Sequence, residues 1–192
     1  MTTQTRGKRG VFLDRDGVII RQVDLLTNLA KVKILPGAAE AIRRLNRLGF
    51  PVIVITNQPV IARGLIPEEG IAKMNQAIGK RLARSGARVD AWYVCPHHPK
   101  ATLSQYRKRC GCRKPGAKML RDGARDLKLD LKRSWMVGDS LIDIVAGKRA
   151  GAMTILVATG PGHARLDKKY KVRADLRAKD LRQAARLIQR QK

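Results

Sequence analysis

The chain has 192 residues, of which 41 are Lys or Arg and 15 are Asp or Glu, so its formal net charge at pH 7 is +26. A chain of this length suits one domain and can bury a core without disulfide bonds. The hydrophobic content of 44% excludes a wholly disordered basic tail. The longest apolar run is too short to cross a bilayer, and the first residues lack the apolar core of a secretion signal. We therefore expect one domain over residues 1–192 of a cytoplasmic monomer that does not insert into membranes.

Segments with the pattern of strands alternate with segments that have the pattern of helices. In chain order, the sequence predicts a strand at 10–14, a helix at 36–50, a strand at 51–57, a helix at 67–86, a strand at 90–95, a helix at 116–129, a strand at 134–139, a helix at 140–151, a strand at 153–158 and a basic helix at about 178–190. This alternation predicts an α/β fold, a three-layer Rossmann-like parallel sheet with helices on both faces. Such sheets bind ligands at the carboxyl ends of their strands.

Polar side chains follow the first two predicted strands. Asp14 is the last residue of the first and Asp16 follows it, while Thr56 and Asn57 end the second and Gln58 follows it. A carboxylate can attack phosphorus or exchange protons, and hydroxyl and amide groups can donate to phosphate oxygens. The alternatives are an ordinary acidic turn and a helix cap, which such residues favour. Neither pattern decides between these interpretations alone.

Acidic residues also close the fourth predicted strand, and two cations precede the third long helix. Asp139 and Asp143 stand one helical turn apart and share a face. Their hard oxygen ligands suit Mg²⁺, although acids also favour a helix N-terminus without any metal. Lys114 can neutralise a phosphoryl group, and Arg113 can bind a second anion through its guanidinium fork. In so basic a chain, however, any one cation is commonly a surface charge.

The three cysteines lie within a short segment with a histidine. The pattern is Cys95-x-His97 followed by Cys110-x-Cys112. Three thiolates and one imidazole complete a tetrahedral zinc site, and a closed set of four ligands is structural rather than catalytic. His98 competes with His97, which the C-x-H spacing favours. Unpaired core cysteines beside a chance histidine are the alternative. We expect a zinc loop over about 95–112 that orients the two cations that follow it.

Taken in order, the D-x-D, T-N, Lys and G-D-x-x-x-D motifs resemble those of the haloacid dehalogenase superfamily of phosphatases, over about residues 10–160. The resemblance implies that Asp14 is the nucleophile and Asp16 the general acid and base. It also implies that Thr56 and Lys114 hold the transferring phosphoryl group. The Mg²⁺ ligands that it implies are Asp14, the backbone carbonyl of Asp16, and Asp139, with Asp143 in support.

The segments FLDRDGV, TNQPVIARG, YVCPHHP, CGCRKP and WMVGDSLIDI are similar to those of the D-glycero-D-manno-heptose 1,7-bisphosphate phosphatase family. The resemblance implies removal of the 7-phosphate during synthesis of heptose for lipopolysaccharide or other surface glycans. Histidinol-phosphate phosphatases share the zinc pattern and are the alternative, together with phosphatases that act on other small molecules. The family has no large cap domain, and the stretch 17–35 leaves no room for one. Two features depart from the family: the segment 18–33 lacks its usual Asn and Gly-Tyr, and the second proline after CRKP is absent.

The same resemblance assigns residues to substrate binding. It implies that Arg113 binds the distal part of the substrate and that Asn57, Gln58 and Arg63 lie near the entrance of the site. The resemblance specifies the chemistry better than the substrate, because the segment 18–33, which departs from the family, helps to select the substrate. We expect a small anionic sugar bisphosphate.

The excess of positive charge suggests an alternative of another class, a basic nucleic-acid-binding module on the same fold. The segment 161–192 carries eleven Lys or Arg against three Asp. Charge runs are commonly solvated, and an aromatic content of 4% leaves few side chains for base stacking. The apolar residues of the last helix favour one buried face, so we do not favour nucleic acid as the partner. That face comprises Leu181, Ala184, Ala185 and Ile188.

Overall fold

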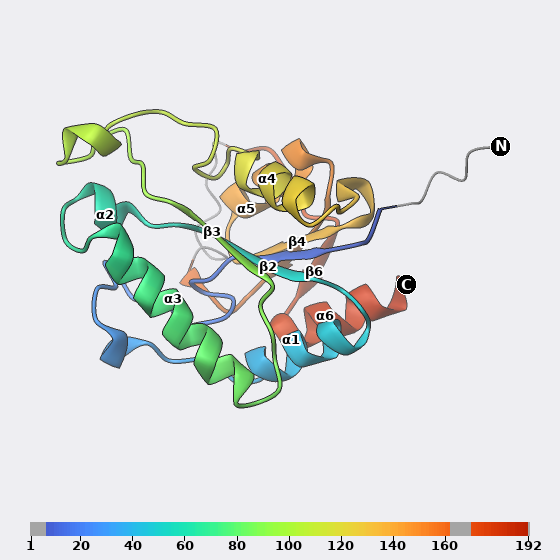
Figure 1. The fold of residues 1–192 in the computed structure, drawn as a ribbon. Helices are drawn as coiled ribbons and strands as arrows, with labels where there is room; N and C mark the ends of the chain where they lie inside the picture. The colour runs from blue at the N-terminus through green and yellow to red at the C-terminus, as the bar shows by residue number, and fades with distance from the viewer. Residues whose placement is uncertain (1–6, 162–169, 192) are drawn as a thin grey trace.

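A parallel β-sheet runs through the part of the chain that the computed structural model describes, residues 7–161 and 170–191 (Figure 1). The strand order is β3-β2-β1-β4-β5-β6, and every neighbouring pair is parallel. The strands are β1 (Val11–Leu13), β2 (Val52–Asn57), β3 (Ala91–Cys95), β4 (Trp135–Gly138), β5 (Met153–Val157) and β6 (Leu176–Ala178). The predicted α/β sheet is therefore confirmed.

Helices cover both faces of this sheet. They are α1 (Ala38–Arg47), α2 (Pro59–Ala62), α3 (Glu68–Ala83), α4 (Lys118–Asp126), α5 (Leu141–Ala150) and α6 (Leu181–Arg190), with 3-10 turns η1 (Leu29–Lys31), η2 (Ser104–Tyr106) and η3 (Leu131–Arg133). One core layer joins the sheet to α1, α3 and α6, and a second joins the opposite face to α4 and α5. Figure 1 shows the two groups of helices on opposite sides of the strands.

The position of β1 in the middle of the sheet explains why its sequence is apolar without interruption. Val11 and Leu13 pack into the layer of α1, α3 and α6, and Phe12 packs into the layer of α4 and α5. All three side chains are fully buried. Side chains alternate across a strand, so a strand covered on both faces has no solvated position.

The last part of the chain differs in detail from the prediction. The helix expected from about 178 begins at Leu181, where the Asp180 carboxylate caps it by accepting from the Gln183 N–H at 2.8 Å. The short strand β6 precedes it and was not predicted, because three residues carry no readable periodicity. The four predicted apolar positions of α6 are buried, as expected of an amphipathic helix. Residues 162–169 and 192 of the basic segment lie outside the described residues.

The topology collects the predicted polar side chains at one edge of the sheet. The chain leaves β1 for β2 and β3, then returns to β4 on the other side of β1. Asp14, Thr56 and Asp139 therefore stand at adjacent strand ends, at the switch point where such sheets bind ligands. The segment between β1 and α1 forms a loop with the turn η1 and no cap domain. Among the described residues, none of the helices combines the length and apolar character needed to cross a membrane.

We predict that Leu45→Ala lowers the free energy of unfolding by about 2–5 kcal/mol, because Leu45 is fully buried between α1 and the sheet. Chemical denaturation measures the change. Arg47→Ala, at an exposed position of the same helix, is the control and should change it by less than about 0.5 kcal/mol. Equal effects of the two substitutions would contradict this description of the core.

Candidate active site

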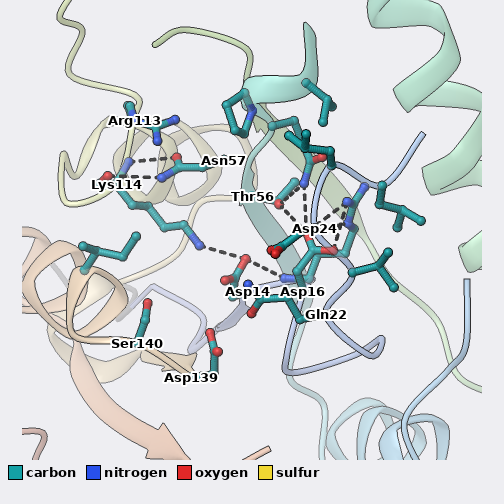
Figure 2. Close-up of a pocket in the computed structure, with 18 of the residues that line it drawn as sticks. Asp14, Asp16, Gln22, Asp24, Thr56, Asn57, Arg113, Lys114, Asp139 and Ser140 are labelled. Carbon is teal, nitrogen blue, oxygen red and sulfur yellow. Dashed lines mark hydrogen bonds and ion pairs between the residues drawn. The ribbon is translucent and has the colours of Figure 1, made fainter. Parts of the chain in front are cut away.

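The carboxyl ends of β1, β2 and β4 open into a cleft of about 560 Å³ (Figure 2). The opposite wall of the cleft is the segment 22–26, which follows β1. Most of the residues that the sequence analysis singled out line the cleft. They are Asp14, Asp16, Thr56, Asn57, Gln58, Arg63, Arg113, Lys114 and Asp139.

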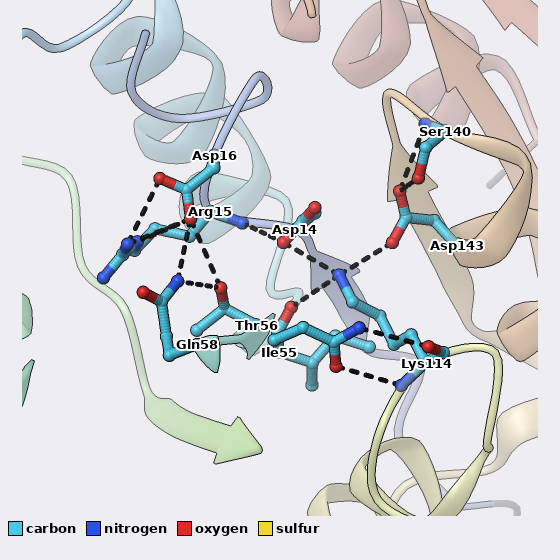
Figure 3. A network of polar contacts seen from close by, with 10 residues as sticks. Asp14, Arg15, Asp16, Ile55, Thr56, Gln58, Lys114, Ser140 and Asp143 are labelled. Atoms are coloured by element: carbon cyan, nitrogen blue, oxygen red, sulfur yellow. Dashed lines mark hydrogen bonds and ion pairs between the residues drawn. The ribbon is translucent and has the colours of Figure 1, made fainter. Parts of the chain in front are cut away.

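The ammonium group of Lys114 lies buried between two carboxylates (Figure 3). Its Nζ is 2.8 Å from Asp14 Oδ1 and 2.7 Å from Asp143 Oδ1, and it donates to the carbonyl of Ile55 at 3.2 Å. Burial by itself would lower the pKa of Lys114, but the two carboxylates outweigh it and raise that pKa. Lys114 therefore stays cationic and places a full positive charge at the floor of the cleft.

The surroundings of Asp14, unlike those of Lys114, disfavour the charged form of the side chain. Burial raises the pKa of Asp14 well above its ordinary value, and the neighbouring carboxylates of Asp143, Asp139 and Asp16 raise it further, against the lowering effect of Lys114. The Arg15 N–H donates to Asp14 Oδ1 at 2.7 Å. The site thus gathers more negative charge than Lys114 alone offsets, which favours binding of a further cation.

The donor set of this cluster fits Mg²⁺. Carboxylate oxygens of Asp14, Asp139 and Asp143 lie within 4.8 Å of one another, and hard oxygen ligands are what Mg²⁺ prefers. Asp143 is fully buried and already engaged, since its Oδ2 accepts from Ser140 Oγ at 2.6 Å and from the Ser140 N–H at 3.1 Å. Asp14 and Asp139 are the carboxylates that line the cleft itself.

Gly17 provides the space that Asp139 needs. Gly17 has a φ of +80°, and a Cβ at this position would lie 2.7 Å from Asp139 Oδ2. Both the left-handed backbone and the close approach require glycine. The final residue of the DRDG segment is thus part of the site, although the sequence analysis gave it no role.

The carboxylate of Asp16 is held by side chains that lie just beyond the ends of β1 and β2 (Figure 3). Gln58 Nε2 donates to Asp16 Oδ2 at 2.9 Å and to Thr56 Oγ1 at 2.8 Å. Arg15 donates from Nε to Oδ2 and from Nη2 to Oδ1, both at 3.1 Å. The sequence analysis missed Arg15. The available signal was its position directly after a fully buried strand, where an arginine needs a buried partner.

The amide groups of Asn57 and Gln58, which the resemblance assigned to substrate binding, are engaged within the protein. Asn57 Oδ1 accepts from the Lys114 N–H at 3.0 Å, and Asn57 Nδ2 donates to the Lys114 carbonyl at 3.1 Å. Gln58 is 4% exposed and bonds to Asp16 as described. Both residues line the cleft, where they fix the main chain at Lys114 and the carboxylate of Asp16.

A second cluster of ligand-type side chains lies beside the cleft. The three sulfur atoms of Cys95, Cys110 and Cys112 lie 3.0–3.6 Å apart, and His97 Nδ1 lies 3.3 Å from Cys112 Sγ and 3.8 Å from Cys95 Sγ. Ligands at the corners of a zinc tetrahedron are about 3.8 Å apart, given a Zn–S distance of about 2.3 Å. The cluster is therefore compatible with a zinc site.

Without a metal, the histidine of this cluster has the protonation state of a ligand and the Cys95 thiol does not. Burial raises the pKa of the Cys95 thiol, whereas burial and the charge of Lys108 lower the pKa of His97. The imidazole is therefore neutral, as a metal ligand must be, and a bound cation would be needed to ionise the buried thiol. His98 lies outside the cluster, and its Nδ1 accepts from the Lys100 N–H at 3.1 Å.

Arg113 and Arg63 place positive charge on the wall of the cleft. Arg113 follows the last cysteine directly, and its Nη1 donates to the His97 carbonyl at 3.1 Å. The zinc-type cluster and the cleft therefore share a wall, because the chain passes from Cys112 through Arg113 to Lys114.

Comparison with known proteins gives matches over most of the chain. A family model described as haloacid dehalogenase-like hydrolase matches residues 11–100, and a second, HAD-hydrolase-like model matches residues 111–184. The D-glycero-beta-D-manno-heptose-1,7-bisphosphate 7-phosphatase of Photorhabdus laumondii is 40% identical over 157 residues, which cover 81% of this chain and 84% of that protein. The protein of the same name from Rhodopseudomonas palustris is 40% identical over 151 residues, which cover 79% and 84%.

Solved structures agree with this likeness. The crystal structure of D,D-heptose 1,7-bisphosphate phosphatase from B. bronchiseptica, complexed with magnesium and phosphate, is 33% identical, with a TM-score of 0.85. The match covers 96% of this chain and 99% of that one. The phosphatase of the same name from Burkholderia thailandensis is 31% identical, with a TM-score of 0.69 and coverage of 95% and 99%.

We predict that Lys114→Met lowers the free energy of unfolding by about 3–5 kcal/mol, because it leaves the carboxylates of Asp14 and Asp143 buried without their cation. Denaturant titration of the metal-free protein measures the loss. Lys118→Met is the matched control, since it removes an exposed i, i+4 pair with Asp122 and should leave stability essentially unchanged. A stable Lys114→Met protein would refute the buried-pair description.

Proposed function

Because the chain belongs to the haloacid dehalogenase-like hydrolases, we propose that it is a Mg²⁺-dependent phosphatase that removes the 7-phosphate of D-glycero-D-manno-heptose 1,7-bisphosphate. The observation that carries the proposal is the buried Lys114 beside Asp14, at the switch point of the sheet, in a chain 40% identical to phosphatases of that name. The product would supply heptose for lipopolysaccharide or other surface glycans.

The proposed reaction has two steps, and Asp14 and Asp16 carry its covalent and proton-transfer chemistry. In the first step an Asp14 oxygen forms a bond to phosphorus while the bond from phosphorus to the sugar oxygen breaks. The electron pair stays with the sugar oxygen, which takes a proton from Asp16. In the second step Asp16 takes a proton from water as the water oxygen attacks phosphorus. Phosphate leaves, and the Asp14 carboxylate is restored.

Positive charge at the floor of the cleft offsets the charge that develops on the phosphoryl oxygens. We assign this role to the Lys114 ammonium, with the Thr56 hydroxyl as a further donor. A bound Mg²⁺ would add positive charge at the same oxygens. Its proposed ligands are Asp14, the backbone carbonyl of Asp16, and Asp139. Asp143 would support the site by holding Lys114 rather than by direct ligation, as its bonds to Lys114 and Ser140 suggest.

The second phosphate of the substrate has a natural partner in the two arginines of the cleft wall. We propose that Arg113 and Arg63 bind the 1-phosphate through charge-assisted hydrogen bonds. Histidinol phosphate, the alternative substrate, carries an ammonium group where the bisphosphate carries its second anion. Two guanidinium groups on the wall favour the bisphosphate, because they would repel that ammonium group.

We further propose that Cys95, His97, Cys110 and Cys112 hold a structural zinc ion. With both ends of its loop fixed to one ion, the main chain that follows would present Arg113 and Lys114 at a constant place. The reducing cytoplasm would keep these cysteines free for the metal. Every proposed site residue belongs to one chain, so we propose that the monomer is the active form.

The substrate proposal predicts phosphate release from the heptose bisphosphate in the presence of Mg²⁺, at a kcat/KM at least about tenfold above that for histidinol phosphate. Steady-state phosphate assays on both anomers and on histidinol phosphate measure this. Asp14→Asn should abolish turnover on every substrate, because an amide does not replace the carboxylate as nucleophile. Phosphate release by Asp14→Asn would overturn the assignment of the nucleophile, and a preference for histidinol phosphate would overturn that of the substrate.

The zinc proposal predicts one equivalent of zinc in the purified protein, measured by elemental analysis, and its loss from Cys112→Ser. KM for the bisphosphate should rise in that variant, because Arg113 follows Cys112 directly and would lose its fixed place. His98→Ala is the control, since His98 lies outside the cluster, and it should retain the metal. Unchanged KM in a zinc-free Cys112→Ser protein would show that the metal does not position the arginine.

A further inference from the structure

A buried arginine connects the cleft to the middle of helix α3. The guanidinium of Arg15 is fully buried, and its Nη1 donates to Asn75 Oδ1 at 3.0 Å. Asn75 is 3% exposed and lies 60 residues further along the chain. It does not line the cleft, so it has no direct access to a substrate there.

Asn75 is an exception on the buried face of α3. The other buried positions of that helix are Ile71, Met74, Ile78 and Leu82, all apolar. A polar side chain in such a place costs free energy unless it is hydrogen-bonded, and the bond to Arg15 meets that need. A hydrophobic residue would serve packing better, so the asparagine has a use other than packing.

Because of the geometry of the guanidinium, the bond between Arg15 and Asn75 also affects the carboxylate of Asp16. A guanidinium is planar and presents its donors in a fixed fork. Arg15 directs Nε and Nη2 at the two oxygens of Asp16 and Nη1 at Asn75. Because the group is rigid, an acceptor at Nη1 fixes the plane of the fork, and the fork in turn fixes the carboxylate. Gln58 completes the arrangement from the other side with a bond of 2.9 Å to Asp16 Oδ2.

We propose that Asn75 is a positioning residue for the reaction: it fixes the guanidinium of Arg15 and thereby holds the carboxyl group of Asp16 in place for proton transfer to the leaving oxygen. The inference rests on the proposed phosphatase mechanism, in which Asp16 is the proton donor. Without Asn75, the Nη1 donors of Arg15 lose their buried acceptor. The guanidinium then turns toward another acceptor, and Asp16 moves with it.

Two substrates with different leaving groups can distinguish a positioning role of Asn75 from a merely structural one. When the phosphorus–oxygen bond to a sugar breaks, the electron pair stays on an alkoxide oxygen that needs the proton of Asp16. When the same bond to p-nitrophenol breaks, the pair stays on a stable phenolate that needs no proton. If the carboxyl group of Asp16 is displaced, the first step therefore becomes slower for sugar phosphates, and its rate is unchanged for p-nitrophenyl phosphate. A loss of folded enzyme lowers both signals by the same factor.

The test is Asn75→Leu, which keeps the branching at Cγ and the number of side-chain heavy atoms and removes the acceptor. We expect kcat for the sugar bisphosphate to fall about tenfold or more, a part of the 10²–10⁴ that a positioned general acid contributes. KM should stay within about twofold, because Asn75 lies outside the cleft. The stopped-flow burst of p-nitrophenolate should stay within about threefold of wild type, since that step needs no general acid. Equal losses on both substrates, or no loss on either, would overturn the proposal.

Two further variants make the test independent of folding. Asn75→Asp keeps an acceptor oxygen for Arg15 and should recover most of the lost kcat, whereas failure to recover it would count against the proposal. Ile78→Val changes a fully buried residue one turn further along α3 and removes no hydrogen-bond partner of Arg15, so it should leave the ratio of the two rates unchanged. A wild-type protein inactive on the heptose bisphosphate would refute the proposed substrate alone, because the ratio can be measured with any alkyl phosphate that it hydrolyses.

Discussion

The arrangement of the cleft depends on one buried ammonium group. Lys114 is 2% exposed, and a charge so far from water is stable only when opposite charges surround it. The compensating carboxylates come from the end of β1 and from the first turn of α5, while the lysine comes from the loop before α4. These three segments can meet only when β1 and β4 are paired and α5 is packed on the sheet. The ion pairs therefore depend on the packing of the whole sheet and cannot form from one segment alone.

Neighbouring residues hold both Asp143 and the main chain of Lys114 in place. Ser140 bonds to Asp143 through both its hydroxyl and its N–H, and Asn57 bonds to both main-chain groups of Lys114. The cysteine cluster lies at the base of the same loop, since Cys95 ends β3 and Cys112 stands two residues before Lys114. On the side of the cations, the cleft is thus bounded by main chain that hydrogen bonds and the cysteine cluster adjoin. The opposite wall is the segment 22–26. This segment belongs to the loop between β1 and α1, so the loop that follows the first strand forms one side of the cleft.

The large net charge has only a small part in the chemistry. Among the described residues, the cleft is lined by four basic side chains and four acidic ones: Arg15, Arg63, Arg113 and Lys114, and Asp14, Asp16, Asp24 and Asp139. Other described basic residues lie away from it, as in the groove along α1 and the end of α3 that Arg43, Arg47, Arg84 and Arg88 line. A positive field of this size attracts anionic ligands over long distances and is screened by salt. Such a field attracts negative charge in general, whereas the proposed role of Arg63 and Arg113 is to bind the second phosphate at one place in the cleft.

The sequence by itself determined the order of strands and helices, the acids at the strand ends and the grouping of the cysteines with His97, because periodicity and close spacing are local properties. It did not reveal β6, whose three residues are too few for a pattern. Only the tertiary structure decided that Asp143 bonds to Lys114, that Asn57 bonds to the main chain 57 residues away, and that Arg15 meets Asn75 across 60 residues. Such partners are chosen by burial: once packing removes a polar group from water, it bonds to whatever donor or acceptor the fold has placed beside it, and no local pattern records that choice.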